Sequence, residues 1–379
     1  MTETRIKVLD LRDAPWFDGP GRTIIEVASG LESRGIDICI ASFVSGKIDN
    51  ANYLDKALEK GLQTFEIKEN AIFDPKVVEQ IVSICHSQRI DILHTHEFRS
   101  NVYGLHIARK LKLPIISTAH GWIANSFKRK IFSMIDKTIL SLFFDRVIAV
   151  SDSVAHKIYA SRLRNNSIVT VHNTLDTKGY RIHHDNGLRS RYAIPPQVPI
   201  IAKIGRLSPE KRQINLIRSI KRLVDAGYEL RLLLIGVGPD EAELKALVAE
   251  LGLQEIVLFT GFIREMQPVY SEVDLVVQAS STEGLPNVVL EAMLMRVPVI
   301  ATDVGGTAEV INDESVGVLI RPGDDDQLTD SMRNFLDAPE QFRQKLDAAE
   351  RRIRESFDSD MRLQKMAQIY RSVLPDTLS

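Results

Sequence analysis

Short apolar runs alternate with stretches of helical periodicity along almost the whole chain. Runs of this kind rich in Ile, Val and Leu predict buried strands, and a regular strand–helix alternation is typical of parallel α/β sheets. Helical periodicity appears, for example, at Thr23–Ser33, Pro75–Ser87 and Asn101–Lys110. The strands predicted in the first half are Arg5–Leu11, Ile36–Ser42, Asp91–His94, Pro114–Thr118, Arg146–Val150 and Ile168–Val171.

A second alternation begins after a polar stretch that leads to Pro195-Pro196. Beyond Asp324 the chain is predicted to be helical, closing with Arg362–Val373. The strands predicted in this half are Val198–Gly205, Leu230–Ile235, Ile256–Phe259, Leu275–Gln278, Val297–Ala301 and Val316–Ile320.

We therefore expect an α/β protein with two doubly wound Rossmann-like domains. They are assigned to residues 1–180 and 198–355, joined by a linker at 181–197 and followed by a C-terminal helix within 356–379. Open α/β sheets bind ligands at the carboxyl ends of their strands, so these ends should face a central cleft.

The composition is that of an ordinary globular protein, with 44% hydrophobic and 26% charged residues in a chain of 379. A net charge of −2 excludes a general nucleic-acid binder, which would carry a strong basic excess. Cys39 and Cys85 both lie in apolar runs, and we expect both side chains to be buried. A single disulfide between them is the alternative, but nothing demands it, so we expect the protein to be in a reducing compartment. The N-terminus has no signal-peptide pattern and no apolar run is long enough to span a bilayer, so we expect a cytoplasmic protein, at most peripheral to a membrane.

The most informative stretch carries Glu283 and Glu291, eight positions apart on either side of a glycine and a proline. Pro286 suits the first position of a helix, so Glu283 falls in the preceding loop and Glu291 one turn beyond Asn287. The N–H groups between the two acids lie at a positive helix end, where a phosphate binds well. An acid at each edge of an anion site fits a sugar nucleotide, which has hydroxyls on both sides of its phosphates. The alternative is an acid near a helix start and another on a solvated face.

A second anion motif follows the predicted strand at Ile200–Ile204. Gly205 ends that strand, and Arg206 and Lys211 supply a planar guanidinium and a compact ammonium as the next helix opens. The alternative is a pair of surface cations that form weak ion pairs with Glu210.

Two further glycine motifs lie at strand–helix junctions. Ile235–Pro239 lacks the full dinucleotide fingerprint, and a tight turn is the better interpretation. The loop Asp18–Arg22 follows the first strand, where Gly19 and Gly21 would let the backbone approach a phosphate, or would only serve a turn.

Three histidines lie at the ends of two predicted strands. His94 and His96 form a His-x-His with Glu97 beside it, which leaves a zinc site as an alternative, although we expect no metal. His120 follows the strand Pro114–Thr118 and is well placed to contact a sugar hydroxyl.

Segment Phe127–Phe144 mixes Lys and Arg with Phe, Ile and Leu. We expect a helix whose apolar face packs on the sheet with its basic residues in water. The alternative is an amphipathic helix that contacts an anionic membrane.

Taken together, these motifs resemble those of the retaining glycosyltransferases of family 4 (GT4), which have the two Rossmann-like domains of the GT-B arrangement. The resemblance covers nearly the whole chain and is most specific for the pair Glu283 and Glu291 together with the segment Asp303–Gly306. It also includes the first glycine loop and the segments Ser117–Gly121, Val147–Ser151, Val171–Thr174 and Gly205–Lys211.

The resemblance implies a transferase that moves a sugar from a nucleoside-diphosphate donor, with a UDP-sugar expected, to a glycan or lipid-linked hydroxyl, without a metal or other cofactor. The N-terminal domain would bind the acceptor, the C-terminal domain the donor, and the last helix would cross back onto the N-terminal domain. Surface polysaccharide assembly is the expected pathway. By analogy with the family, the configuration at the anomeric carbon would be retained.

The resemblance also assigns roles residue by residue. Glu283, His120, Arg206 and Lys211 would serve the reaction itself, with Glu283 on the transferred sugar and His120 touching it from the N-terminal side. Glu291 would hold the ribose. The full set expected to bind the donor is Gly19, Gly21, Gly205, Arg206, Lys211, Ile263, Glu283, Gly284, Leu285, Pro286, Asn287 and Glu291.

Two departures stand out: the first loop reads Gly-Pro-Gly rather than paired glycines, and Arg212 stands where glycine is common. Two rival functions remain, a nucleotide-sugar epimerase of the same architecture and a sugar-nucleotide-binding protein without activity. An epimerase would need no acceptor, and a binding protein would show no transfer.

Overall fold

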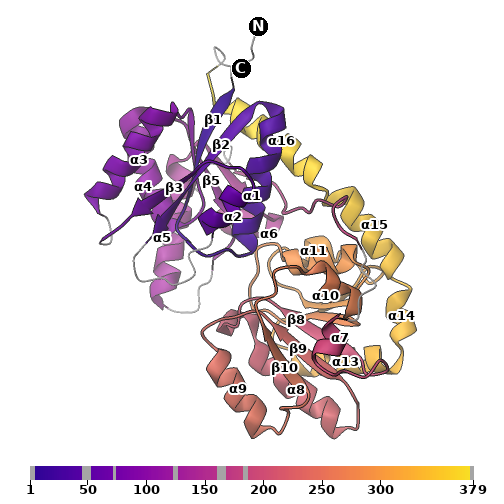
Figure 1. The fold of residues 1–379 in the computed structure, drawn as a ribbon. Helices are drawn as coiled ribbons and strands as arrows, with labels where there is room; N and C mark the ends of the chain where they lie inside the picture. Colours follow the sequence, from indigo (N-terminus) through magenta and orange to yellow (C-terminus); the bar gives the residue numbers. More distant parts are fainter. Residues whose placement is uncertain are drawn as a thin grey trace. The chain divides into compact units, whose positions relative to one another are not determined.

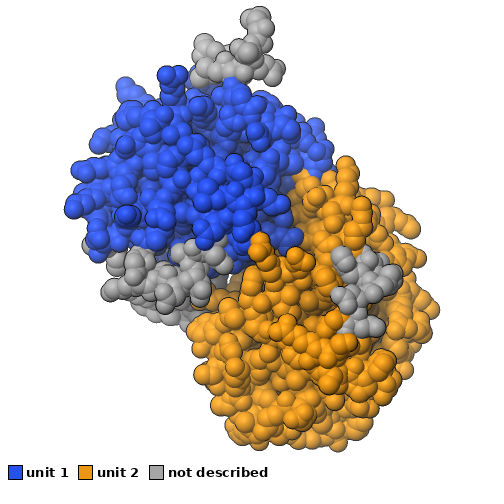
Figure 2. All heavy atoms as spheres, viewed as in Figure 1, with its two compact units in different colours: residues 1–173, 360–379 blue, residues 174–359 orange. Residues whose placement is uncertain are grey.

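The computed structural model describes residues 5–44, 53–70, 74–122, 127–159, 168–181 and 187–375, with only the backbone at 127–129. The chain divides into two compact units (Figure 2). Unit 1 comprises residues 1–173 and 360–379, and unit 2 comprises residues 174–359. Residues 182–186 of the predicted linker lie outside the described residues.

Unit 1 contains a parallel sheet of seven strands in the order β3-β2-β1-β4-β5-β6-β7. The order reverses between β1 and β4, where Asp10 pairs in register with His94. The strands are β1 (Ile6–Arg12), β2 (Ile36–Val44), β3 (Thr64–Lys68), β4 (Ile92–Thr95), β5 (Ile115–Ala119), β6 (Arg146–Ala149) and β7 (Ile168–Thr170).

Two helices of unit 1 begin at N-cap residues that are recognisable in the sequence. Asp18 accepts a hydrogen bond from the backbone of Gly21 and caps α1, and Asp74 caps α3 in the same way ahead of Pro75. The helical segments are α1 (Gly19–Leu31), η1 (Glu32–Arg34), α2 (Tyr53–Glu59), α3 (Pro75–Gln88), α4 (Phe98–Leu111), α5 (Phe127–Phe143) and α6 (Asp152–Tyr159).

The last helix, α16 (Ser359–Ser372), packs against unit 1 although it follows unit 2 in sequence (Figure 1). Met366 and Tyr370 are buried in the same apolar cluster as Ile24 and Val8. Gly30 gives α16 room to approach α1, because a Cβ there would lie 2.6 Å from the side chain of Leu363.

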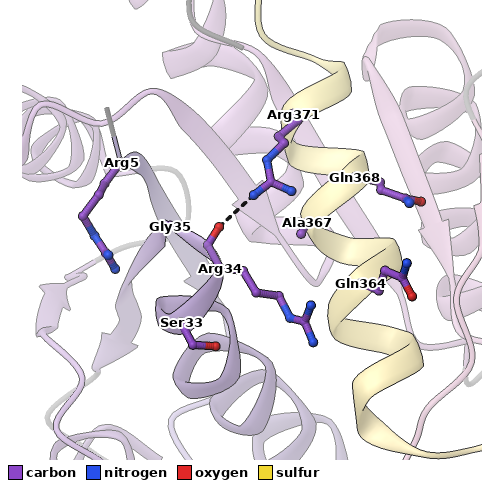
Figure 3. A pocket seen from close by; sticks show the side chains of 8 residues that line it. All are labelled: Arg5, Ser33, Arg34, Gly35, Gln364, Ala367, Gln368 and Arg371. Carbon is purple, nitrogen blue, oxygen red and sulfur yellow. Dashed lines mark hydrogen bonds between the residues drawn. The ribbon is translucent and has the colours of Figure 1, made fainter. Parts of the chain in front are cut away.

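A pocket of about 720 Å³ lies between α16 and the start of β1 (Figure 3). Its lining includes three arginines, and Arg371 donates a hydrogen bond of 2.8 Å to the carbonyl of Arg34. None of the residues expected to bind the donor lines it; the lining residues are Arg5, Ser33, Arg34, Gly35, Gln364, Ala367, Gln368 and Arg371.

Unit 2 contains a parallel sheet of six strands in the order β10-β9-β8-β11-β12-β13, which reverses between β8 and β11. The four central strands are short and almost wholly buried, as expected for a sheet covered on both faces, whereas the edge strands β10 and β13 are partly exposed. The strands are β8 (Ile200–Ile204), β9 (Arg231–Ile235), β10 (Val257–Gly261), β11 (Leu275–Gln278), β12 (Val299–Thr302) and β13 (Val318–Ile320).

The helices of unit 2 bury Leu216, Ile220 and Met332 against this sheet. They are α7 (Gly187–Arg191), η2 (Pro209–Lys211), α8 (Gln213–Asp225), α9 (Glu241–Glu250), α10 (Gln267–Glu272), α11 (Asn287–Leu294), α12 (Thr307–Val310), α13 (Asp325–Asp337), α14 (Pro339–Arg343) and α15 (Leu346–Ser356).

The predicted fold class is confirmed, with two parallel doubly wound sheets. One strand was missing from the prediction, β3, because Thr64–Lys68 is a partly exposed edge strand with charges in it and little apolar signal. Pro286 forms the N-cap of α11 rather than its first helical residue. Cys39 and Cys85 are buried free thiols. Among the described residues, we find no helix that combines the length and apolar character needed to cross a membrane.

Candidate active site

The strand reversal in unit 2 brings the two predicted donor motifs together. One motif follows β8 and the other follows β11, and these strands are neighbours at the point where the sheet order changes. Lys211 Nζ lies 2.7 Å from Glu283 Oε1, and both side chains are mostly buried, with 20% and 10% exposed. Switch points of this kind are where open α/β sheets bind ligands.

Backbone packing around Gly205 shapes the first motif. Gly205 has a φ of 139°, which only glycine adopts readily, and the chain turns there into η2. Leu207 donates a backbone hydrogen bond of 3.1 Å to Val237, and a Cβ on Gly238 would lie 2.1 Å from the Leu207 carbonyl. The glycines of the Gly236–Gly238 turn therefore allow two loops to pack closely, which agrees with the tight-turn interpretation. Arg206 is exposed at the surface of this loop.

Glu283 is held by a chain of polar side chains that reaches into the sheet. Gln278, at the end of β11, donates to Glu283 Oε1 and accepts a hydrogen bond from Lys203 of β8. Burial opposes ionisation of Glu283, but Lys211 and Lys203 outweigh it, so the pKa of Glu283 is lowered. Burial lowers the pKa of Lys203 to about 7, and the nearby cation of Lys211 adds to this effect.

The loop that carries Glu283 rests on the segment Asp303–Gly306. Gly306 donates a backbone hydrogen bond of 2.7 Å to the carbonyl of Gly284. Gly305 has a φ of 59°, and a Cβ there would lie 2.0 Å from the Glu283 carbonyl. The two glycines therefore fix the height of the Glu283 loop above the sheet.

Glu291 lies inside α11 and is 5% exposed. Tyr270 of α10 donates a hydrogen bond of 2.8 Å to its carboxylate. This hydrogen bond to Oε2 fixes the orientation of the Glu291 carboxylate before a ligand binds.

Arg212 takes the left-handed conformation, with a φ of 53°, at a position where glycine would be unstrained. Its guanidinium lies 3.3 Å from Asp325. The charge is therefore directed to the start of α13.

In unit 1, the first glycine loop packs around a buried arginine. Arg12 is 1% exposed and pairs with Asp18 at 2.6 Å and with Glu97 at 3.3 Å. A Cβ on Gly21 would lie 2.3 Å from its guanidinium, so Gly21 makes room for Arg12. Gly19 opens α1 at the same loop. Contact of these glycines with a phosphate stays a prediction.

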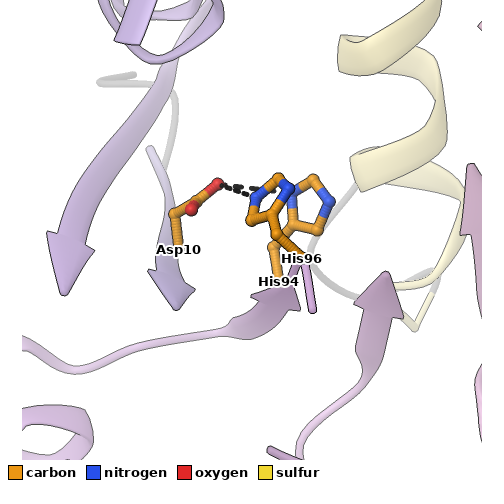
Figure 4. Close-up of side chains that lie close together, drawn as sticks. All are labelled: Asp10, His94 and His96. Atoms are coloured by element: carbon orange, nitrogen blue, oxygen red, sulfur yellow. Dashed lines mark hydrogen bonds and ion pairs between the residues drawn. The ribbon is translucent and has the colours of Figure 1, made fainter. Parts of the chain in front are cut away.

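Three histidines of unit 1, His94, His96 and His120, lie close together at the strand reversal, and Figure 4 shows two of them, His94 and His96, beside Asp10. His96 Nε2 lies 2.8 Å from Asp10 Oδ2, and His96 Nδ1 lies 3.1 Å from His120 Nε2. His94 contacts the hydroxyls of Tyr370 and Thr118 at 2.7 and 2.8 Å.

The zinc alternative placed Glu97 beside His94 and His96, but Glu97 pairs with Arg12 instead. Potential ligand atoms of Asp10, His94 and His96 do lie within 4.8 Å of one another. Every ring nitrogen of the two histidines already has a protein partner within hydrogen-bond distance. The arrangement is thus a hydrogen-bonded network in its own right.

Helix α5 departs from the expected packing of its apolar face. Its buried face includes Ser133, Asp136 and Ser141, and Asp136 bonds Trp122 and Asn101. Large apolar side chains lie outside instead, with 39–62% exposed: Ile131, Phe132, Met134, Ile135 and Phe143. The side chains of residues 127–129, including two of the predicted basic residues, lie outside the described part of the chain.

Of the predicted residues, Lys211, Glu283 and the loop Gly284–Asn287 come together at one switch point, with Glu291 in the helix that follows. Ile263 lies in the loop after β10, partly exposed. Sequence reasoning missed Lys203, Gln278 and Asp10. A charged residue inside an otherwise apolar strand, as in Ile-Ile-Ala-Lys-Ile or Val-Leu-Asp-Leu, was the available signal.

Comparison with solved structures places the fold in a class. HepE of Anabaena, solved in complex with UDP and glucose, superposes with a TM-score of 0.87 at 19% identity, over 97% of this chain and 100% of that one. The same Anabaena protein has also been solved with UDP-glucose. The two-sheet architecture is thus that of the GT-B glycosyltransferases.

Comparison of sequences identifies the family. The family described as glycosyl transferases group 1 matches residues 186–353, and Glycosyltransferase Family 4 matches residues 17–178. N-acetyl-alpha-D-glucosaminyl L-malate synthase of Bacillus anthracis is 26% identical over 372 residues, 96% of each chain. The capsular polysaccharide biosynthesis glycosyltransferase CapM of Staphylococcus aureus is 23% identical over 322 residues, 82% of this chain and 84% of that one. The chain belongs to the GT4-type glycosyltransferases.

Proposed function

We propose that this glycosyltransferase moves a hexose from a UDP-sugar to a hydroxyl of a glycan or lipid-linked acceptor, retains the anomeric configuration and needs no metal. The observation that carries the proposal is the Lys211–Glu283 pair at the switch point of unit 2. The UDP and UDP-glucose complexes of HepE support the choice of donor.

Lys211 and Arg206 bind the donor diphosphate, together with backbone N–H groups at the start of α11. Departure of a nucleoside diphosphate develops negative charge, and fixed cations stabilise that charge in the transition state. Two cations and the N-terminal end of a helix can stabilise this negative charge without a metal ion, which supports a metal-independent reaction. When the diphosphate arrives, it competes with Glu283 for Lys211.

Glu283 then orients the transferred sugar, and Glu291 holds the ribose. Glu283 is ionised and already bonded to Lys211 and Gln278, so its carboxylate suits a hydrogen-bond acceptor for sugar hydroxyls. It does not serve as the covalent nucleophile of retaining glycosidases. The acceptor attacks from the face of the leaving group, and a phosphate oxygen takes its proton, which retains the configuration.

The acceptor is an intermediate of surface polysaccharide assembly. The similarity of this chain to CapM, a glycosyltransferase of capsular polysaccharide biosynthesis, supports this choice. The exposed apolar residues of α5 support an acceptor presented at an anionic membrane surface, where part of this helix contacts lipid.

The test is a thermal-shift survey of UDP-, GDP- and ADP-sugars, followed by transfer assays with the donor that stabilises the protein. We expect a UDP-sugar to raise the melting temperature most. We also expect a donor with an axial anomeric bond to give a product with an axial glycosidic bond. An inverted product would contradict retention. Sugar interconversion without an acceptor would favour the epimerase alternative, and binding without transfer to any acceptor would favour the binding protein.

A further inference from the structure

The hydrogen-bond order in unit 1 fixes which nitrogen of His120 carries its proton. We propose that Asp10 and His96 act as positioning residues: they hold His120 with Nδ1 unprotonated, so that it accepts a hydrogen bond from a hydroxyl of the bound substrate. This inference rests on the proposed function for the substrate but not for the hydrogen-bond order.

The chain of contacts runs from the buried interior to the protein surface. Asp10 is 2% exposed and His96 7%, whereas His120 is partly exposed. Asp10 lies on β1, His96 directly after β4 and His120 directly after β5, so three neighbouring strands set the spacing. A chain held by three packed strands is rigid, as a positioning device requires.

The order of donors follows from chemistry. A carboxylate only accepts hydrogen bonds, so His96 must donate from Nε2 to Asp10 at 2.8 Å. A neutral imidazole has one N–H, which leaves Nδ1 of His96 as an acceptor. His120 must then donate from Nε2 to that nitrogen at 3.1 Å, and its own Nδ1 has no proton.

The rings of His96 and His120 are both neutral. Burial lowers the pKa of His96 and of His120 well below the usual range, and nearby cations reinforce the effect. His94 does not fix the order, because its partners are hydroxyls, which donate or accept equally well.

Protonation of Asp10 removes the constraint that fixes this order, because a neutral carboxyl donates as well as accepts. In the reversed order the carboxyl donates to His96 Nε2, His96 donates from Nδ1 to His120 Nε2, and the proton taken up lies on His120 Nδ1. Burial raises the pKa of Asp10 to about 7, against the opposing influence of His94 and Arg12. The change in hydrogen-bond order is therefore expected near neutral pH. The titratable and charged groups around Asp10 are Arg12, Tyr53, His94, His96, Arg362 and Tyr370.

The first test needs no measurement of activity, and it uses a variant only to assign a resonance. Long-range ¹H–¹⁵N NMR of protein labelled in histidine, with His120 assigned from a His120→Asn spectrum, reports which ring nitrogen is protonated. At pH 8.5 we expect His120 protonated at Nε2, and on lowering the pH through about 7 we expect the proton to appear on Nδ1. A proton on Nδ1 at pH 8.5 would overturn the inference.

The second test is Asp10→Asn, whose amide donates as well as accepts and so no longer fixes the order. At pH 8.5 we expect kcat to fall on the order of a hundredfold, the scale of a misplaced catalytic contact, with donor KM little changed. We expect the kcat of the wild type to fall below pH 7, where Asp10 becomes protonated, and we expect this pH dependence to be absent in Asp10→Asn. Asp145→Asn, which alters an acid that bonds Ile115 at the opposite end of β5, is the matched control and should leave kcat unchanged.

The two tests separate this inference from the proposed function. Nε2 protonation of His120 in a protein that transfers no sugar would contradict the function and support the hydrogen-bond order. Sugar transfer by a protein whose Asp10→Asn variant keeps full kcat and the same pH profile would support the function and contradict the positioning role.

Discussion

Lys211 and Glu283 form an ion pair of 2.7 Å, although they lie on loops that follow different strands of unit 2. The pair keeps a cation and a carboxylate at the strand reversal, each neutralised by the other. Breaking a mostly buried pair leaves an uncompensated charge, so it separates readily only for a ligand that binds both groups. In the proposed function, a sugar nucleotide would offer phosphate to Lys211 and hydroxyls to Glu283.

Glu291→Gln should separate ribose binding from phosphate binding. The substitution keeps the size of the side chain and removes its charge, and hydrogen bonds to charged groups are stronger than neutral ones by about 1 kcal/mol or more. We expect calorimetry to show UDP affinity reduced roughly tenfold. Affinity for inorganic diphosphate should be unchanged. Equal losses for both ligands would place Glu291 near phosphate rather than ribose.

Gly305→Ala should displace the Glu283 loop. The new Cβ would lie 2.0 Å from the Glu283 carbonyl, at a φ of 59°. Gly252→Ala is a matched control, because Gly252 has a φ of 68° with open space around its Cβ position. The control should cost about 1–2 kcal/mol of unfolding free energy and leave donor affinity intact. Gly305→Ala should be destabilised and should also bind the donor more weakly. Equal donor affinity in the two variants would contradict the role of Gly305 in positioning the Glu283 loop.

Lys203→Met tests the buried lysine of unit 2. The folded-state pKa of about 7 lies below the ordinary value of 10.5, so the unfolded chain binds more protons between these pH values. The unfolding free energy of the wild type should therefore rise with pH from about 7 towards 10. In Lys203→Met this part of the slope should be missing, as denaturant titrations at pH 7, 8 and 9 would reveal. An identical slope in both proteins would mean that Lys203 is charged throughout.

The exposed side chains of α5 should mediate membrane contact. We expect the wild type to sediment with vesicles that contain anionic lipid, and high salt to reverse the binding. Phe132→Ser with Met134→Ser should abolish sedimentation, whereas Met361→Ser, at an exposed methionine of α16, should not. No sedimentation of the wild type at low salt would remove the membrane from this account.

The fold, and the two loops that lie together at the switch point of unit 2, could be predicted from the sequence because both depend on local pattern. Apolar runs set the strands, and Gly205 with Lys211, or Gly284 with Pro286, mark the loops that follow them. The contacts of Lys203, Gln278 and Asp10 depend on strand order, which places β8 beside β11 and β1 beside β4. That order is a property of the whole sheet and cannot be read from any one segment.

The exposed face of α5 escaped prediction for a different reason. Periodicity showed that one face is apolar, but Asp136, with its bonds to Trp122 and Asn101, lies on the buried face together with Leu140. A buried carboxylate with two donors competes successfully with apolar burial here, and only the tertiary structure shows those donors.

The most direct test of the donor site is calorimetric titration of UDP into wild type, Lys211→Ala and Lys221→Ala in the presence of EDTA. Lys221 pairs with Asp225 on the surface of α8 and serves as the control. We expect wild type and Lys221→Ala to bind UDP equally without a metal, and Lys211→Ala to bind about 10- to 1000-fold more weakly, with transfer reduced in parallel. UDP binding that needs a divalent metal, or that survives Lys211→Ala undiminished, would contradict the account.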